Sequence, residues 1–165
     1  MINGKTLSIN GKNLLVGCDG ITADQNFEWL YYGPLNGTKL YRVKIADLLN
    51  ENLPENQLIK EIETYSEKPN NGGLSIDEKG NIYLTAMESS SIAVILAKDR
   101  TVHPLFKDQK LSWPDGVSYN ENDGYMYVSA AQVHLGAAFN HGKNKSRAPY
   151  YIFRFKPLEK GVPYR

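Results

Sequence analysis

Two aspartates stand in the same position of a repeated pattern, each directly before a glycine that opens a short apolar segment. They are Asp19, before Gly20, and Asp115, before Gly116. Equivalent positions of a repeat lie at the same end of the molecule, so we expect both carboxylates at one mouth. Such hard oxygen ligands suit Ca²⁺ or Mg²⁺, and they also suit a polar organic ligand. The structural alternative is that these carboxylates cap strand entrances by accepting backbone N–H bonds.

The middle repeat departs from this pattern, because Gly72 replaces the aspartate and Asn71 precedes it. Asn71 could substitute as an oxygen ligand. The candidate ligand contacts, and the candidate metal ligands, are therefore Asp19, Asn71 and Asp115. Because one carboxylate is missing, we expect no cofactor from the residues alone, with Ca²⁺ or Mg²⁺ as the alternative.

A tryptophan and a long polar segment supply the other candidate ligand contacts. Trp113 could stack on an aromatic or amine ligand through its π face, or pack between structural units. Residues 130–149 form a stretch that is long for a loop, and we expect it to be ordered and functional. It carries His134, Phe139 and Asn140 as candidate pocket residues. His134 could act as a general base beside a carboxylate, and otherwise is a surface or structural histidine.

Composition excludes several classes of protein. The 19 Lys and Arg residues against 18 Asp and Glu give a net charge of +1, which predicts neither a nucleic-acid nor a membrane partner. Cys18 is the one cysteine, so an internal disulfide and a cysteine-based zinc site are excluded. The first twenty residues contain no secretory signal, which predicts a cytoplasmic protein if Met1 is the natural start.

The elements that position these residues form an internal repeat. Gly20, Gly73 and Gly116 recur at intervals of 53 and 43 residues. Each opens the same order of a short apolar strand, a polar turn and an aromatic-rich strand. A four-stranded antiparallel unit of this length is typical of a β-propeller blade. A sandwich of three hairpins is the alternative, but it gives no reason for a glycine that recurs in phase.

The sequence therefore predicts an all-β propeller of about three four-stranded antiparallel blades. Asn36-Gly37 predicts a hairpin, and Ile45–Leu49 is the one expected helical turn. Fourth strands are expected at Leu58–Tyr65 and Val102–Phe106. The expected boundaries are an outer strand of a preceding blade in 1–16 (Leu7–Ile9 and Leu14–Val16), blades at 17–66, 70–108 and 112–156, and a tail at 157–165.

Three blocks of sequence resemble the yellow / major royal jelly protein family, including its bacterial members. They are GCDGITAD with WLYYGPLNGTKLYRV, GGLSIDEKGNIYLTAMESSSI, and LSWPDGVSYNENDGYMYVSAAQVHL with FNHGKN and APYYIFRF. The resemblance runs from about Asn10 to Phe155, and its third block is the most specific. The Asp-Gly entrances are also shared with gluconolactonase-like propellers.

This resemblance implies a six-bladed propeller of which the chain is the C-terminal half, with a ligand site at one mouth of the channel. The family often places the loop that carries Glu88 near that mouth; the alternative is a solvated loop carboxylate. Three blades do not close a ring. The resemblance therefore implies a second half, from a homodimer or from a missing N-terminal segment. It also implies a secreted or periplasmic location.

Family membership leaves the chemistry open, because the family includes binding proteins, enzymes and storage proteins. The first expectation is a propeller that binds a small molecule, an amine or an aromatic compound. The second is a metal-dependent hydrolase or lactonase of the gluconolactonase type. The third is a truncated remnant with no independent activity. The residues alone do not decide whether the protein is an enzyme.

Overall fold

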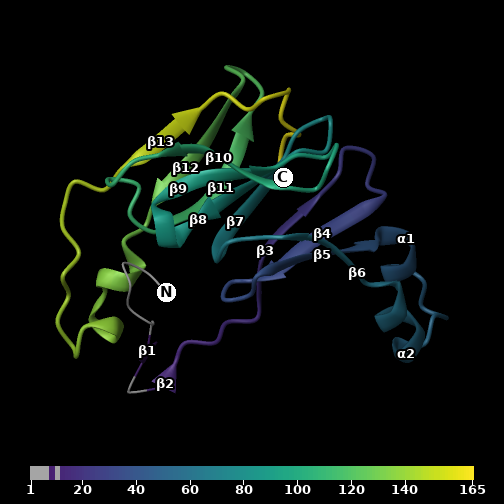
Figure 1. Ribbon diagram of the computed structural model, residues 1–165, viewed down its shortest axis with the longest axis horizontal. Coiled ribbons are helices and arrows are strands. Elements are labelled where there is room, and N and C mark those ends of the chain that lie inside the picture. The colour runs from purple at the N-terminus through teal and green to yellow at the C-terminus, as the bar shows by residue number, and fades with distance from the viewer. Residues whose placement is uncertain (1–7, 10–11) are drawn as a thin grey trace.

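The computed structural model describes residues 8–9 and 12–165, and it consists of β-sheets arranged like the blades of a fan (Figure 1). The first blade has the strand order β3-β4-β5-β6, and the second has β7-β8-β9-β10. All of their neighbouring strands pair antiparallel. The bounds are β3 (Cys18–Ala23), β4 (Trp29–Pro34), β5 (Lys39–Lys44), β6 (Glu63–Glu67), β7 (Asn71–Ile76), β8 (Ile82–Ala86), β9 (Ser91–Ile95) and β10 (Val102–Lys107).

The third blade has three strands in the described part of the chain, where the repeat predicts about four. They are β11 (Pro114–Asn120), β12 (Tyr125–Ala130) and β13 (Ile152–Phe155), in that order across the sheet. The predicted long loop separates β12 from β13. It contains the short 3-10 helices η3 (Val133–Leu135) and η4 (Ala137–Phe139).

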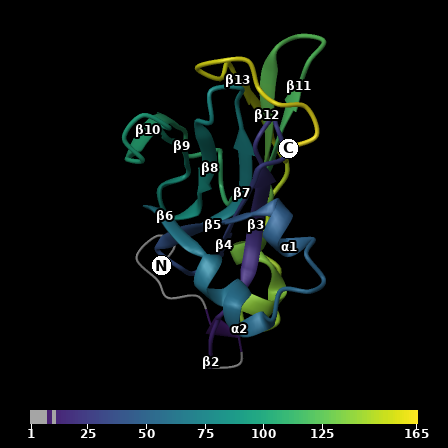
Figure 2. The same cartoon turned by 90° about the vertical axis from the view of Figure 1, so that its right-hand side faces the viewer.

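The first strand of each blade lies innermost, as expected for a propeller. β7 contacts β3 on one side and β11 on the other, so the three inner strands stand side by side (Figure 2). Two apolar clusters fill the spaces between blades. One joins Tyr31 and Leu40 of the first blade to Leu74 and Ile82 of the second, and the other joins the second blade to the third. The radial order confirms the propeller and excludes the three-hairpin sandwich.

The hairpin predicted at Asn36-Gly37 joins β4 to β5, and the N–H of Gly37 donates to the carbonyl of Pro34 at 3.3 Å. The expected helical turn is present as α1 (Ile45–Leu48). The strand expected at Leu58–Tyr65 is wrong at its start, because α2 (Glu55–Leu58) and η1 (Ile59–Glu61) precede β6. Pro54 lies directly before α2, and its ring fixes φ at −61°, a value that suits the start of a helix. The residues that follow it do not alternate between apolar and polar, so they do not favour a strand.

Before the first blade, β1 (Ser8–Ile9) pairs antiparallel with β2 (Lys12–Asn13). These two strands form a sheet of their own, and β1 contacts η4. Of the strand residues expected in 1–16, Leu7 lies outside the described residues, and Leu14–Val16 is not a strand. Within the described residues, no helix is both long enough and apolar enough to cross a membrane.

The tail at 157–165 returns from the third blade to the inner edge of the second. The N–H of Val162 donates to the carbonyl of Ile76 at 3.0 Å, and Gly161 bridges Asp77. Ser75 Oγ donates to the carbonyl of Arg165 at 2.9 Å. Because β7 is the last strand of its sheet, the two backbone contacts, at Ile76 and Asp77, lie along its free edge. The tail therefore lies at the end of β7 opposite to Asn71.

Candidate functional site

Asp19, Asn71 and Asp115 lie at the same mouth of the half-channel, at or near the starts of β3, β7 and β11. Their closeness depends on glycine at the neighbouring positions. A Cβ atom on Gly20 would lie 2.8 Å from Nδ2 of Asn71, and one on Gly72 would lie 2.8 Å from Oδ1 of Asp115. Both distances are shorter than van der Waals contact, so the polar side chains fill space that a larger residue would take.

The two carboxylates of this mouth both have raised pKa values. Partial burial raises the pKa of Asp19, the nearby carboxylate of Asp115 raises it further, and the ammonium group of Lys68 opposes the rise. Burial also raises the pKa of Asp115. Both carboxylates are therefore held where the ionised form is less stable than in water. A cation placed between them would reverse that effect.

Asn71 adds a third acceptor at the same mouth. Its side chain is 1% exposed, and Nδ2 donates to the carbonyl of Gly73 at 3.3 Å. Oδ1 is buried and has no hydrogen-bond donor among the described residues. A buried acceptor without a donor costs about 1–3 kcal/mol. Asn71 therefore has an unused acceptor next to the two aspartates.

Lys68 is a buried cation of this mouth that sequence reasoning missed. Its Nζ donates to the carbonyls of Pro34 at 2.7 Å, Gly37 at 2.8 Å and Pro69 at 3.3 Å. Burial lowers the pKa of Lys68 to about 8, and the carboxylate of Asp19 opposes the fall. The three carbonyls use the three N–H donors, so Lys68 fixes the β4–β5 turn. A lysine between Glu67 and Pro69 gives no local signal of burial.

The aromatic candidates Trp113, His134 and Phe139 pack against one another near the start of β11. The indole of Trp113 stacks on the imidazole of His134, with ring centroids 5.7 Å apart and planes at 11°. Phe139 packs at 6.2 Å from the same indole. Trp113 is 4% exposed and also contacts Leu35 and Met87, so its ring is used in packing. Burial lowers the pKa of His134, which favours the neutral imidazole.

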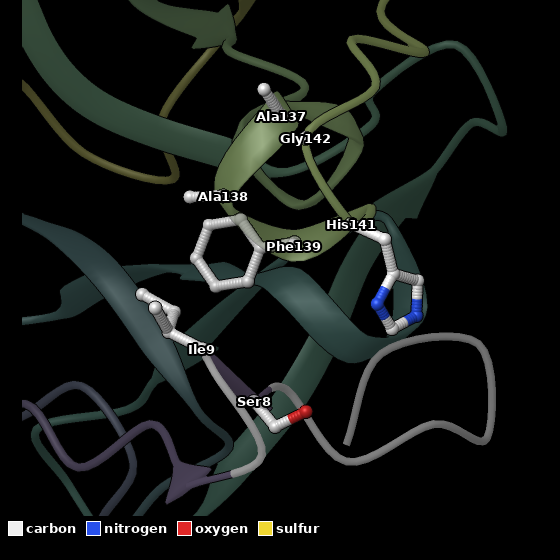
Figure 3. Close-up of a pocket in the computed structure, with 7 residues that line it drawn as sticks. All are labelled: Ser8, Ile9, Ala137, Ala138, Phe139, His141 and Gly142. Carbon is white, nitrogen blue, oxygen red and sulfur yellow. The ribbon is translucent and has the colours of Figure 1, made fainter.

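The other two candidate ligand contacts in the long loop, Asn140 and Phe139, have different surroundings. Asn140 Nδ2 donates to the carbonyls of His134 and Gly136, both at 2.9 Å, so its amide N–H groups hold the loop backbone. Phe139 lines a cavity of about 420 Å³ together with Ile9 and His141 (Figure 3). None of the three acceptors of the mouth lines that cavity. Phe139 therefore lies between this cavity and the indole of Trp113.

Glu88 lies in the 3-10 helix η2 (Met87–Ser89), which connects β8 to β9 at the same mouth, and it is exposed. The residues that the structure brings together are thus Asp19, Asn71 and Asp115, with Lys68 added. Trp113 and His134 stand beside them as packed rings. The remaining candidates lie on the loops around the mouth.

The mouth offers oxygen donors to a cation, but few of them. Among the described residues there is no group of three His, Cys, Asp or Glu side chains that could hold a metal ion. Asp19, Asp115 and Oδ1 of Asn71 are ligands of the type that Ca²⁺ prefers, which takes about six to eight oxygens. These residues would hold one side of such an ion.

Solved structures with the same fold are propellers of about twice this length. The luciferin-regenerating enzyme matches with a TM-score of 0.62 at 16% identity, covering 92% of this chain and 49% of that one. A gluconolactonase from Xanthomonas campestris gives 0.60 at 11%, covering 94% and 53%. The calcium-binding protein regucalcin from Agrobacterium tumefaciens gives 0.57 at 13%, covering 90% and 47%. These identities show the fold alone.

The chain therefore spans about half the length of the six-bladed propellers that it resembles. No curated protein sequence matches it. The model of one family, described as major royal jelly protein, matches residues 3–162, which is nearly the whole chain. The blades, their inner strands and this match agree, and the chain belongs to the major royal jelly protein family.

Proposed function

We propose that this chain is the ligand-binding half of a propeller, and that its ligand is a small molecule with a protonated amine. The observation that supports the proposal is the gathering of two carboxylates and one unpartnered amide oxygen at one mouth. Asp19 and Asp115 raise the local negative charge, and Oδ1 of Asn71 lacks a donor among the described residues. An ammonium group offers positive charge and N–H donors together, which matches all three.

The ammonium group of Lys68 reduces the net negative charge of the mouth. Its ammonium group lies close enough to Asp19 to influence the pKa of that carboxyl, yet its N–H donors are used by backbone carbonyls. The positive charge of Lys68 therefore offsets one carboxylate in part and leaves Asp115 as the principal partner for an amine. The body of the ligand would extend along the channel between the blades.

The experiment compares an arylalkylamine with its neutral counterpart. Dopamine should raise the melting temperature and bind in calorimetry, whereas 4-methylcatechol, which lacks the amine, should bind at least about tenfold more weakly, the effect of one charged hydrogen bond. Asp115→Asn should lose about tenfold in dopamine affinity. Asp108→Asn, on the loop after β10, is the matched control and should bind as the unaltered chain does.

Equal binding of the amine and its neutral counterpart would contradict the proposal, and so would undiminished dopamine binding by Asp115→Asn. The second candidate is a metal-dependent hydrolase, which the oxygen donors and the fold shared with a gluconolactonase favour. Ca²⁺ or Mg²⁺ would then raise the melting temperature, and hydrolysis of a lactone would depend on Asp115. A chain that responds to no amine, metal or lactone would instead be a remnant without independent activity.

A further inference from the structure

Neighbouring blades of this chain pack face to face twice, the first on the second and the second on the third. The first and third blades each have one further face that none of the described blades covers. We call the face of a blade toward the next blade its leading face, and the opposite one its trailing face. Residues directly opposite on neighbouring strands share a face, so the register defines each surface. In the first blade the leading row is Thr22, Tyr31 and Arg42. Thr22 and Tyr31 are 4% and 5% exposed, and Tyr31 packs against the second blade.

The second blade repeats this row with Ser75, Tyr83 and Val94 in the same register. Ser75 and Tyr83 are fully buried, and Tyr83 and Val94 pack against the third blade. Both leading rows therefore begin with a small hydroxyl residue on the inner strand, paired with a tyrosine on the next strand. In both blades this row lies in an interface.

The third blade carries the same row, but there it is open. Ser118 pairs with Tyr127 and Tyr127 with Arg154, in the register that Thr22, Tyr31 and Arg42 have in the first blade. Ser118 and Arg154 are exposed, and Ile152 beside them is 77% exposed. No described residue covers this face as the second blade covers Tyr31.

The trailing faces show the complementary pattern. The trailing row of the second blade is Leu74, Leu84 and Ala93, each at most 5% exposed against the first blade. The equivalent row of the first blade is Ile21, Tyr32 and Tyr41, whose two rings lie 5.9 Å apart. Ile21 is 55% exposed, although its equivalent Leu74 is buried.

We propose that a second copy of this chain covers both surfaces. The leading row of the third blade of each copy would pack on the trailing row of the first blade of the other. Arg154, whose guanidinium lies 4.6 Å from the ring centroid of Tyr125 in its own blade, would then also face the rings of Tyr32 and Tyr41 of the other copy. Three blades of a six-bladed ring turn through about 180°, so this head-to-tail contact closes with two copies.

The mass of the purified chain in solution tests the proposal directly. Light scattering should give about 37 kDa, twice the 18.6 kDa of one chain. Ile21→Asp and Ile152→Asp should each give an 18.6 kDa species that retains the β-sheet circular dichroism of the unaltered chain. Leu49→Asp, which replaces a 75% exposed residue after α1, is the matched control and should remain dimeric.

The pair of variants separates a ring from other dimers. In a ring both surfaces are used at each contact, so a mixture of the two variants restores one intact interface and should regain part of the 37 kDa species. Dissociation by Ile21→Asp with no effect of Ile152→Asp would show a contact between two first blades and would overturn the ring. A monomeric unaltered chain or an open-ended polymer would also overturn it. If a variant does not fold, the mass of the unaltered chain still decides.

Discussion

At the scale of single residues, the mouth of the channel combines acidic and basic side chains, and burial disfavours the charged form of each. Asp19 and Asp115 have raised pKa values, and Lys68 has a lowered one. Groups whose pKa values are shifted in opposite directions and that lie close together are typical of binding sites, where stability is exchanged for function.

Asp115→Asn should stabilise the fold at pH 7 while weakening amine binding. Burial raises the pKa of Asp115, so the native state holds this proton more tightly than the unfolded chain does. The resulting contribution to stability is complete below the unfolded pKa and is lost as the pH rises through the native one. Melting temperatures over a pH series should show the variant above the unaltered chain at pH 7, with the difference closing towards about pH 4.

Asp99→Asn is the control of opposite sign. Hydrogen bonds from Thr101 lower the pKa of Asp99, so its contribution is present at neutral pH and is lost on acidification. This variant should melt below the unaltered chain at pH 7. A lower melting temperature for Asp115→Asn at pH 7 would show instead that its carboxylate is a structural cap.

Lys68→Met should remove a rise of stability at alkaline pH. The pKa of Lys68 falls from 10.5 to about 8 in the native state, so the unfolded chain binds more protons between these values. The free energy of unfolding therefore rises with pH across this interval, and it should not do so in the variant. The carbonyls of Pro34 and Gly37 also lose a donor, which costs about 1–3 kcal/mol.

Denaturant unfolding at pH 8 and above measures both effects of this substitution. Lys60→Met, on the exposed helix η1, is the control and should change neither quantity. An identical pH dependence of Lys68→Met and the unaltered chain would contradict the assignment of Lys68 as the buried cation.

At the scale of elements, a side-chain clamp holds the two ends of the long loop together. Nε2 of Gln132 donates to the carbonyl of Arg147, and Oε1 accepts from the N–H of Arg147, both at 2.9 Å. Gln132 has φ of +51°, so the chain turns sharply where the clamp begins. This pair joins the two ends of a segment without regular strands.

Gln132→Asn should loosen the loop without unfolding the blades. Asparagine tolerates the left-handed backbone but is too short to hold the same clamp. Amide hydrogen exchange should increase several-fold in η3 and η4 and stay unchanged in β7 and β8. Gln57→Asn in the exposed helix α2 is the matched control. Unchanged exchange in the loop would show that the packing of Trp113 on His134 suffices to order it.

The tail is the other element with a defined structural role. Gly161 lies against the ring of Tyr119, and an added Cβ would overlap that ring. Gly161→Ala should therefore lower the free energy of unfolding by about 1–3 kcal/mol, as overpacking does. Gly17→Ala, where a Cβ meets nothing within 4 Å, should change it little. Equal stability of the two variants in denaturant would contradict the docking of the tail on the inner strands.

At the scale of the whole molecule, the second blade is enclosed on both sides, whereas the first and third each have one uncovered face. Strands β7, β8 and β9 are buried along their whole length. Ile21 and Ile152, on the uncovered faces, are 55% and 77% exposed. Stability is therefore expected to be highest in the second blade and lowest at the two faces.

A partner on these faces would couple stability to concentration. If two copies close the ring, the melting temperature should rise over about a hundredfold increase in chain concentration, because only folded chains associate. Ile21→Asp should melt at one temperature throughout that range. A concentration-independent melting temperature for the unaltered chain, together with a constant mass, would contradict dimer formation.

The sequence by itself determined the repeat, the inner strands and the placement of Asp19 and Asp115 at one mouth. These follow from local chemistry, because alternation, turn residues and glycine spacing act over a few neighbouring positions. It did not determine the helix before β6, where a proline outweighed a weak strand pattern, or the burial of Lys68. Only the tertiary structure decided that the ring of Trp113 is used in packing and which blade faces are uncovered, because these depend on contacts between residues far apart in the chain.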